Sequence, residues 1–133
     1  MIGLDTCVLV RYFTQDDARQ TAIATKLIDS LTPTTPGFIP VAAMIELLWV
    51  LRSSYGKSRE QLKVVVRRIL ASTSFVVEST AVIWRALRVF ETTGIGFCDC
   101  VVGWTCEARG CEYTATFDKA AARTAGFRLL KDA

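Results

Sequence analysis

Four acidic residues, each set among apolar neighbours, are the positions of this sequence that could do chemistry. They are Asp5, Glu46, Asp99 and Asp118. A carboxylate among apolar residues carries a desolvation cost unless it is paired or coordinates a metal. The immediate flanks of the first three contain no basic residue, whereas Lys119 follows Asp118. If the fold brings the four carboxylates together, their mutual repulsion demands a cation, and Mg²⁺ or Mn²⁺ best suits such oxygen ligands.

The absence of histidine limits the other chemistry that is open to this chain. No histidine occurs among the 133 residues, and the five cysteines form no C-x-x-C pair. Ser-His-Asp and Cys-His catalysis are therefore excluded, and a structural zinc site is disfavoured. The cysteines are best interpreted as small apolar residues in a reducing compartment. Chemistry here has to depend on carboxylates, hydroxyls and metal ions.

Length and composition predict one soluble domain over residues 1–133. An apolar fraction of 51% is typical of a chain with a well-packed core at this length. Pro40 and Glu46 interrupt the longest apolar stretch, so we expect no membrane-spanning segment. The amino terminus has no basic region ahead of an apolar stretch, unlike a secretion signal. We therefore expect a cytoplasmic protein with no membrane partner.

Short apolar segments alternate along the chain with segments of helical periodicity. Strands are expected over residues 1–4, 38–39, 75–77, 113–116 and 127–130, and helices over 6–14, 17–31, 41–54, 58–71, 80–91, 97–109 and 119–124. This alternation predicts an α/β fold with a parallel sheet covered by helices on both faces. Ligands of such sheets bind beyond the carboxyl ends of the strands. Asp5 and Asp118 follow the first and fourth strands, so their carboxylates should meet if those strands are neighbours.

Residues 52–68 carry most of the local positive charge. The basic residues there are Arg52, Lys57, Arg59, Lys63, Arg67 and Arg68. Ser58 and Gln61 have the spacing of a capping box at the start of the helix that carries most of them, as Asp17 and Gln20 do for an earlier helix. Such a run is usually a solvated helical face, but it is also the electrostatic footprint of a nucleic-acid partner.

The order of the motifs resembles the PIN-domain ribonucleases and, within them, the VapC-type toxins of bacterial toxin–antitoxin pairs. The matching segments are residues 2–6, 16–17, 45–51, 97–99 and 116–119. They cover essentially the whole chain in the order of the family. One position departs from the family pattern, because Cys7 stands where the family commonly has Asn. A thiol is a poorer hydrogen-bond partner than a carboxamide, so the positioning of a ligand or substrate should differ there.

The resemblance implies a single PIN-like domain with three layers, in which helices flank a central parallel sheet of about five strands. It also implies a Mg²⁺-dependent endoribonuclease toxin that leaves 5′-phosphate and 3′-hydroxyl ends. Asp5 and Asp99 are the expected metal ligands, while Glu46 and Asp118 complete the catalytic and metal site. The hydroxyls of Thr6 and Thr116 would support the carboxylates or a phosphate. RNA, a small cognate antitoxin and a second copy of the chain are the expected partners.

Ordinary structural roles compete with these assignments. Asp5 and Asp118 could cap the helices that follow them, and Asp99 could complement the dipole of its helix. Glu46 lies in mid-helix among apolar residues, where neither capping nor solvation is an easy explanation. Thr6 and Thr116 could be plain structural hydroxyls.

Three other functions remain to be weighed. A PIN domain that has lost catalysis could bind RNA or a partner protein without cutting. In that case, Cys7 would indicate the lost activity. A haloacid-dehalogenase-type phosphatase needs a second Asp two residues after the first, where Cys7 stands instead. A receiver-like signalling domain needs an Asp after the third strand, where Glu78 occurs.

Overall fold

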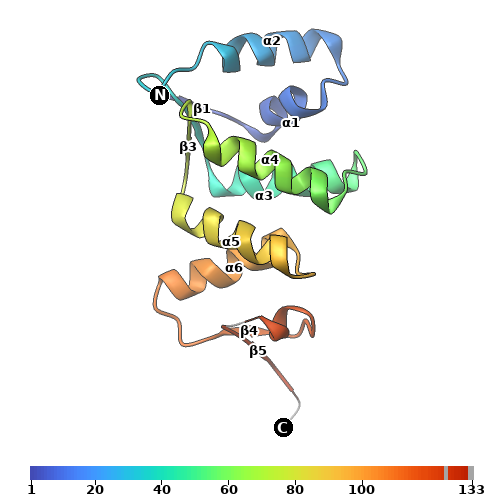
Figure 1. Ribbon diagram of the computed structural model, residues 1–133, viewed down its shortest axis with the longest axis vertical. Helices are drawn as coiled ribbons and strands as arrows, with labels where there is room; N and C mark the ends of the chain where they lie inside the picture. The colour runs from blue at the N-terminus through green and yellow to red at the C-terminus, as the bar shows by residue number, and fades with distance from the viewer. Residues whose placement is uncertain (125, 132–133) are drawn as a thin grey trace. The chain divides into compact units, whose positions relative to one another are not determined.

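Within the residues that the structure describes, each strand is two or three residues long and every pairing between strands is parallel. The computed structural model describes residues 1–124 and 126–131. Two compact units divide the chain, an N-terminal unit (Met1–Thr80) and a C-terminal unit (Ala81–Ala133). Both units combine helices with parallel strands (Figure 1). The predicted α/β class is therefore confirmed, with a small sheet.

The N-terminal unit contains three strands and four helices. They are β1 (Ile2–Gly3), α1 (Thr6–Thr14), α2 (Ala18–Asp29), β2 (Gly37–Ile39), α3 (Val41–Ser53), α4 (Arg59–Ala71) and β3 (Phe75–Val77). The strands pair in the order β1-β2-β3, with Ile2 opposite Gly37 and Gly37 opposite Phe75. An added Cβ at Gly37 would lie 2.7 Å from Leu4 Cδ1 and 2.8 Å from Leu31 Cδ1. Only glycine therefore fits the centre of this ladder without moving the core.

The core of the N-terminal unit is made by the inner faces of its helices. Its fully buried side chains include Leu9, Ile39, Met44, Leu47, Leu51, Val66 and Ile69. Helix α1 packs on both α2 and α3. The prediction that residues 1–4 form a buried strand is only half right, because Leu4 is 2% exposed but Ile2 is 44% exposed. Strand β1 lies at the edge of its ladder, where a single neighbour covers it.

The C-terminal unit is built from two long helices, a short turn of helix and two strands. They are α5 (Thr80–Thr92), α6 (Phe97–Ala108), β4 (Thr114–Thr116), the 3₁₀ turn η1 (Ala121–Arg123) and β5 (Phe127–Leu129). Phe90 of α5 meets Phe97 of α6 edge to face, with ring centroids 5.8 Å apart. Strand β4 pairs with β5. The strands predicted as one sheet of about five thus form, within the described residues, one ladder of three and one of two.

The helix boundaries follow the sequence signals closely. Ser58 accepts a hydrogen bond from the backbone N–H of Gln61, and the Gln61 side chain accepts one from Ser58, which confirms the predicted capping box. The helix predicted over residues 119–124 shrinks to the 3₁₀ turn η1. No helix within residues 1–124 and 126–131 is long and apolar enough to span a membrane.

Candidate active site

Asp5 lies at the carboxyl end of β1, where the chain turns into α1. It is the N-cap of that helix, and its Oδ1 accepts a hydrogen bond of 2.7 Å from the backbone N–H of Thr6. The thiol of Cys7 donates to the other oxygen, Oδ2, over 3.7 Å, the long distance expected of a weak S–H donor. Asp5 is exposed, so burial imposes no desolvation cost on it. The Cys7 thiol therefore contacts the carboxylate of Asp5, the first candidate metal ligand, directly.

Glu46 lies on the exposed face of α3, which overturns the interpretation that apolar neighbours bury it. Leu47 and Leu48, its next neighbours, are buried, whereas Glu46 itself is exposed. Trp49, one turn later, is 67% exposed. A helix places residues three or four apart on one face, so apolar neighbours in sequence need not surround a side chain. Solvation, the explanation that the sequence disfavoured, accounts for this carboxylate.

Asp99 lies in the first turn of α6, three residues after its N-cap, Gly96. Its carboxylate points back toward that cap, because a Cβ added at Gly96 would lie 3.6 Å from Asp99 Oδ2. Asp99 is half-buried. Burial raises the pKa of its carboxyl, and the negative charge of Asp118 raises it further. Of the four candidates, Asp99 alone has the desolvated setting that the sequence predicted for all of them.

Asp118 follows β4 and holds the turn that leads into η1. Its Oδ1 accepts hydrogen bonds from the backbone N–H groups of Ala120, at 2.8 Å, and Ala121, at 3.2 Å. Its own N–H donates to Thr116 Oγ1 over 3.0 Å. Asp118 is exposed. Asp118 does not cap η1, whose N-cap is Ala120, but these hydrogen bonds give Asp118 and Thr116 a structural role in the turn and fix where this carboxylate lies.

The supporting hydroxyls have different surroundings. Thr6 is 7% exposed and is a buried polar residue of the N-terminal unit. Thr116 is half-buried and contacts the candidate acid Asp118 through the backbone rather than through its carboxylate. Thr116 therefore acts on the turn that positions Asp118.

The structure brings Asp99 and Asp118 close enough for their charges to interact, and both belong to the C-terminal unit. Asp5 and Glu46 belong to the N-terminal unit. Within the part of the chain that the structure describes, no group of three or more acidic or cysteine side chains could hold a metal ion. A Mg²⁺ ion is commonly held by one or two carboxylates, waters and substrate phosphates rather than by a cage of protein ligands. The Asp99–Asp118 pair fits that pattern.

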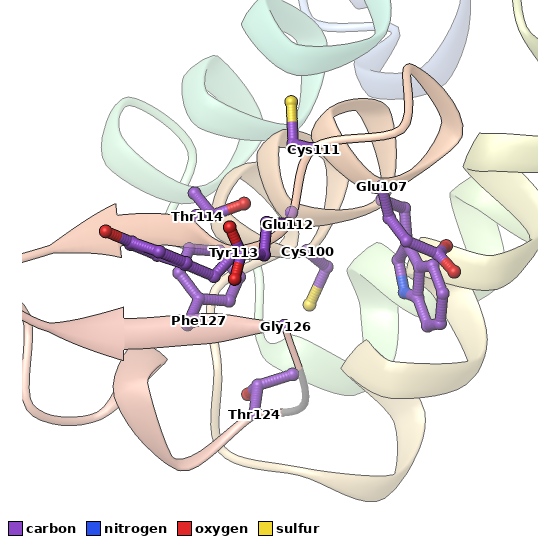
Figure 2. Close-up of a pocket in the computed structure, with 11 residues that line it drawn as sticks. Cys100, Glu107, Cys111, Glu112, Tyr113, Thr114, Thr124, Gly126 and Phe127 are labelled. Carbon is purple, nitrogen blue, oxygen red and sulfur yellow. The ribbon is translucent and has the colours of Figure 1, made fainter.

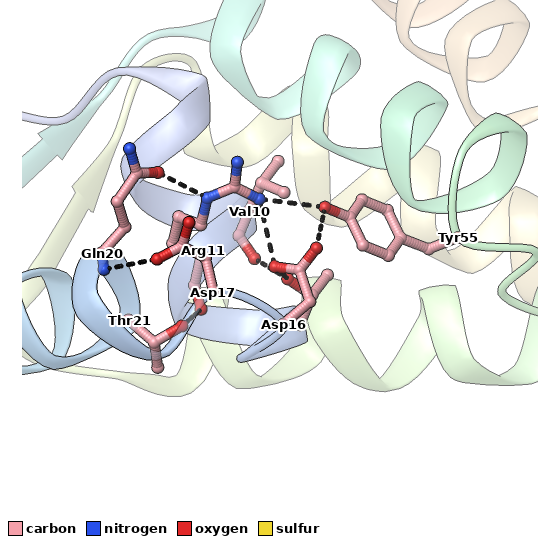
Figure 3. Close-up of polar contacts among 8 residues, drawn as sticks. Val10, Arg11, Asp16, Asp17, Gln20, Thr21 and Tyr55 are labelled. Carbon is pink, nitrogen blue, oxygen red and sulfur yellow. Dashed lines mark hydrogen bonds and ion pairs between the residues drawn. The ribbon is translucent and has the colours of Figure 1, made fainter.

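The N-terminal unit contains a polar network that the sequence did not predict (Figure 3). Arg11 Nη1 lies 3.1 Å from Asp16 Oδ1, and Tyr55 Oη donates to Asp16 Oδ2 over 2.7 Å. Arg11 Nε donates to Gln20 Oε1 over 2.7 Å. The Gln20 side chain therefore contacts Arg11, and only the Asp17 half of the predicted capping box forms, with a bond of 2.9 Å. No sequence signal joins Tyr55 to Asp16, because 39 residues separate them.

This network sets the ionisation of its charged members. Hydrogen bonding from Tyr55, then from Thr14, and the charge of Arg11 lower the pKa of Asp16 against the opposing effect of burial. The hydrogen bond with Tyr55 and the charge of Asp16 raise the pKa of Arg11. The loop between α1 and α2 is thereby tied to the end of α3. Asp16 therefore has a structural role in the N-terminal unit.

A cavity of about 140 Å³ lies between α6 and the β4–β5 ladder of the C-terminal unit (Figure 2). Its lining includes Cys100, Glu107, Tyr113 and Phe127. The ring of Phe127 packs against Gly103 so closely that a Cβ there would collide with it. The volume is below the roughly 300 Å³ at which small-molecule sites begin. Among the described residues, the lining includes neither Asp99 nor Asp118.

The exposed carboxylates, the Asp99–Asp118 pair and the parallel α/β architecture can now be compared with known proteins. No curated protein and no solved structure matches the chain. A family model described as PIN domain matches residues 2–127. That range includes all four candidate acids and most of each unit. Because the match covers far more than half of the sequence, the chain belongs to the PIN domain family.

Proposed function

We propose that this protein is a Mg²⁺-dependent endoribonuclease that hydrolyses RNA phosphodiester bonds and acts as the toxin of a toxin–antitoxin pair. PIN domains are generally nucleases and typically use divalent metal ions. The observation that carries the proposal is the PIN domain match over residues 2–127. The half-buried Asp99, whose pKa is raised by burial and by the charge of Asp118, supports it, because a bound cation would relieve both effects. The absence of histidine leaves carboxylates as the acidic and basic groups available for such a reaction.

Within this proposal, residues 1–133 act as a single domain and all four acids take part in the reaction. Asp99 and Asp118 would hold Mg²⁺, or Mn²⁺ in its place, and Asp5 and Glu46 would be the other catalytic carboxylates. A bound ion would supply a water of lowered pKa and neutralise charge at the scissile phosphate. The protein fixes its carboxylates beforehand, Asp5 through its helix cap and Asp118 through the two backbone N–H groups of its turn.

The surface chemistry of the chain supports the proposed partners. Trp49 of α3 and Phe117 beside Asp118 are 67% and 80% exposed. Large exposed aromatic side chains are enriched where proteins meet one another. We therefore retain a homodimer and a small antitoxin as proposed partners, together with RNA as substrate. The proposed location is the cytoplasm, where RNA is accessible.

Cleavage of single-stranded RNA by the purified chain tests the proposal. Cleavage should require Mg²⁺ or Mn²⁺, stop in EDTA and leave 5′-phosphate ends. Asp5→Asn and Asp99→Asn should each lose activity while the protein remains folded by circular dichroism. Glu112→Gln, which neutralises an exposed carboxylate of the C-terminal unit, is the charge-matched control and should cleave normally. Undiminished cleavage in EDTA that is absent from a parallel preparation of Asp99→Asn would belong to the protein itself and would rule out the metal-dependent mechanism.

The second candidate function is a PIN domain that binds RNA or a partner protein without cutting. The contact between the Cys7 thiol and Asp5 favours it, since a weak donor at 3.7 Å replaces the carboxamide common in the family. Cys7→Asn separates the two readings. Under the nuclease proposal the wild type cuts RNA and the variant cuts at least as well. RNA binding in Mg²⁺ without cleavage, followed by a gain of cleavage in Cys7→Asn, would establish the second function instead.

A further inference from the structure

A second cavity, of about 350 Å³, lies wholly within the N-terminal unit. It opens between the ends of α1, α2 and α4 and the start of β3. Its lining includes aromatic, charged and hydroxyl side chains, among them Tyr12, Phe13, Asp29, Arg68, Ser72 and Phe75. The volume falls within the roughly 300–1,000 Å³ of small-ligand sites, unlike that of the cavity in the C-terminal unit. Its size admits an organic ring with polar substituents.

Aromatic rings and a guanidinium group form one wall of this cavity. Tyr12 and Phe13 meet edge to face, with centroids 5.2 Å apart. Arg68 lies over the Phe13 ring, with its Cζ 5.4 Å from the centroid. Phe75 adds a third half-buried ring. Aromatic rings and Arg guanidinium planes are the surfaces on which proteins stack unpaired nucleobases.

The helix that carries Arg68 adds positive charge beside the cavity. Arg59, Lys63 and Arg67 share α4 with it, and Glu60, which lies 2.8 Å from Lys63, is the one acid in that helix. Arg68 itself is exposed, so its guanidinium can contact solvent or an anion as well as Phe13. A nucleotide has both a flat ring and a phosphate, and this wall offers a partner for each.

The lining of the cavity also contains polar groups. Asp29, at the end of α2, brings an exposed carboxylate that can only accept hydrogen bonds when ionised. Ser72 Oγ accepts from the backbone N–H of Ser74 over 3.2 Å and keeps its own proton to donate. A carboxylate acceptor favours a base that presents N–H donors. Guanine offers two adjacent ones, and uracil offers one.

The parallel ladder places Phe75, which lines this cavity, and Asp5 at opposite ends of its short strands. Phe75 begins β3, whereas Asp5 follows the carboxyl end of β1. Since Gly37 is opposite both Ile2 and Phe75, the strands are in parallel register. The amino end of β3 and the carboxyl end of β1 therefore lie at opposite ends of the ladder. The cavity and Asp5 are separate places on the same unit.

We propose that this cavity is a subsite for one unpaired RNA base, guanine in preference to uracil. The base stacks against Phe13 and Arg68, Arg68 also contacts the phosphate, and Asp29 accepts hydrogen bonds from the base. The inference rests on the proposed function in one respect, since it takes RNA to be the substrate. Binding at this subsite does not require cleavage. It should therefore affect the Kd and KM for RNA.

Binding of fluorescein-labelled single-stranded RNA to the full chain, followed by anisotropy in EDTA, tests the proposal without any cleavage. The probes are oligouridine and the same strand with one internal guanosine. Phe13→Leu and Arg68→Ala should each weaken binding of the guanosine strand by about 5- to 100-fold, the range of one base stack. Arg68→Lys, which keeps the charge and removes the plane, should give an intermediate loss. Asp29→Asn should reduce the preference for guanosine.

The control variant is Arg19→Ala, which removes an equal charge from the exposed surface of α2. It should bind both strands as the wild type does, and thermal melting should show every variant folded. In Mg²⁺, Phe13→Leu should raise KM while kcat is retained. RNA that is bound but never cut, with binding weakened as above, would support the subsite and reject the nuclease.

Two results would overturn the subsite. Equal RNA affinity in Phe13→Leu, Arg68→Ala and wild type would exclude a stacked base, even if the wild type cleaves RNA normally. A loss of binding of the same size in Arg19→Ala would mean that the loss in Arg68→Ala reflects the overall charge of the protein and not a stacked base. If RNA affinity stays constant while a partner protein binds these variants more weakly, the cavity accepts a protein side chain and the RNA subsite is rejected.

Discussion

Asp99 and Asp118, 19 positions apart in the sequence, are electrostatically coupled in the folded C-terminal unit. Burial raises the pKa of Asp99, and the carboxylate of Asp118 raises it further. Asp118 is itself held in place by the N–H groups of Ala120 and Ala121. The backbone of the turn therefore holds Asp118 where its charge repels that of Asp99. In the absence of a cation, this repulsion disfavours the ionised form of Asp99.

Asp99→Asn should make the metal-free protein more stable at neutral pH. The folded-state pKa of Asp99 is raised, so its contribution to stability is present below the unfolded pKa, about 3.9, and is lost as the pH rises through the folded value. The variant lacks that loss. Thermal melting in EDTA across the acidic and neutral range should show the gain at neutral pH and its disappearance below about pH 4. A variant less stable than wild type at neutral pH would contradict the assignment.

Added Mg²⁺ should make the wild type more stable than Asp99→Asn, the reverse of the order of stability expected in EDTA. A ligand that binds only the folded state stabilises it in proportion to the logarithm of its concentration over Kd. Wild type should therefore gain melting temperature with Mg²⁺, and Asp99→Asn should gain little. Its cleavage rate should fall by more than the roughly 10- to 100-fold that is usual when an outer-shell partner of a metal is lost.

Asp118 offers a way to separate the effect of its charge from the effect of its turn hydrogen bonds. Asp118→Asn keeps an oxygen that can accept from Ala120 N–H, whereas Asp118→Ala removes it. We expect both to lose cleavage. Only the alanine variant should also lose stability, by about 1 kcal/mol, the usual net contribution of a hydrogen bond. Urea unfolding in EDTA checks the difference, and equal stability of the two variants would mean that the turn hydrogen bonds contribute nothing.

The sequence predicts the elements of this fold better than it predicts which side chains are buried. Helical periodicity and capping signals are local, and α1 (Thr6–Thr14) begins and ends where they indicate. Burial depends on which face of a helix packs. Apolar residues occur on every side of α3, with Trp49 67% exposed, so periodicity could not reveal that Glu46 faces solvent.

The sequence names the candidate site residues but not their contacts. Apolar neighbours single out the four acids, whose catalytic role stays a prediction, and the PIN domain match confirms the family. Contacts across long sequence separations leave no local trace. Tyr55 with Asp16, or Arg68 with Phe13, could be found only from the folded chain.

Glu46→Gln should lower cleavage without changing stability. Because the side chain is exposed, removing its charge should alter the free energy of unfolding by no more than about 0.5 kcal/mol, the usual range for surface substitutions. A strong loss of activity at unchanged stability would assign Glu46 to the site. Normal cleavage in Glu46→Gln would leave it as a solvated residue of α3. Cleavage assays and urea unfolding on the same preparation provide both measurements.

Asp16→Asn should remove the acid sensitivity of the loop between α1 and α2. The pKa of Asp16 is lowered in the folded state, so its contribution to stability is present above the unfolded pKa and is lost as the pH falls through the folded value. Wild type should therefore lose stability between about pH 4 and lower values more steeply than the variant. Tyr55→Phe, which removes the main hydrogen bond, should reduce the slope in the same direction. Acid titrations of melting temperature that are parallel in all three proteins would count against the network.

The last prediction concerns the proposed antitoxin. Basic side chains are attracted to carboxylate clusters, and the resemblance implies that antitoxins of this family often cover the acidic site with such a side chain. Mg²⁺ and that side chain would then seek the same negative site. Antitoxin affinity should therefore fall as Mg²⁺ rises at constant ionic strength, and it should fall again in Asp5→Asn without Mg²⁺. Equilibrium titrations with the proposed antitoxin provide the measurement. An affinity that responds neither to Mg²⁺ nor to Asp5→Asn would place the inhibitory contact away from the carboxylates, on exposed apolar residues such as Trp49.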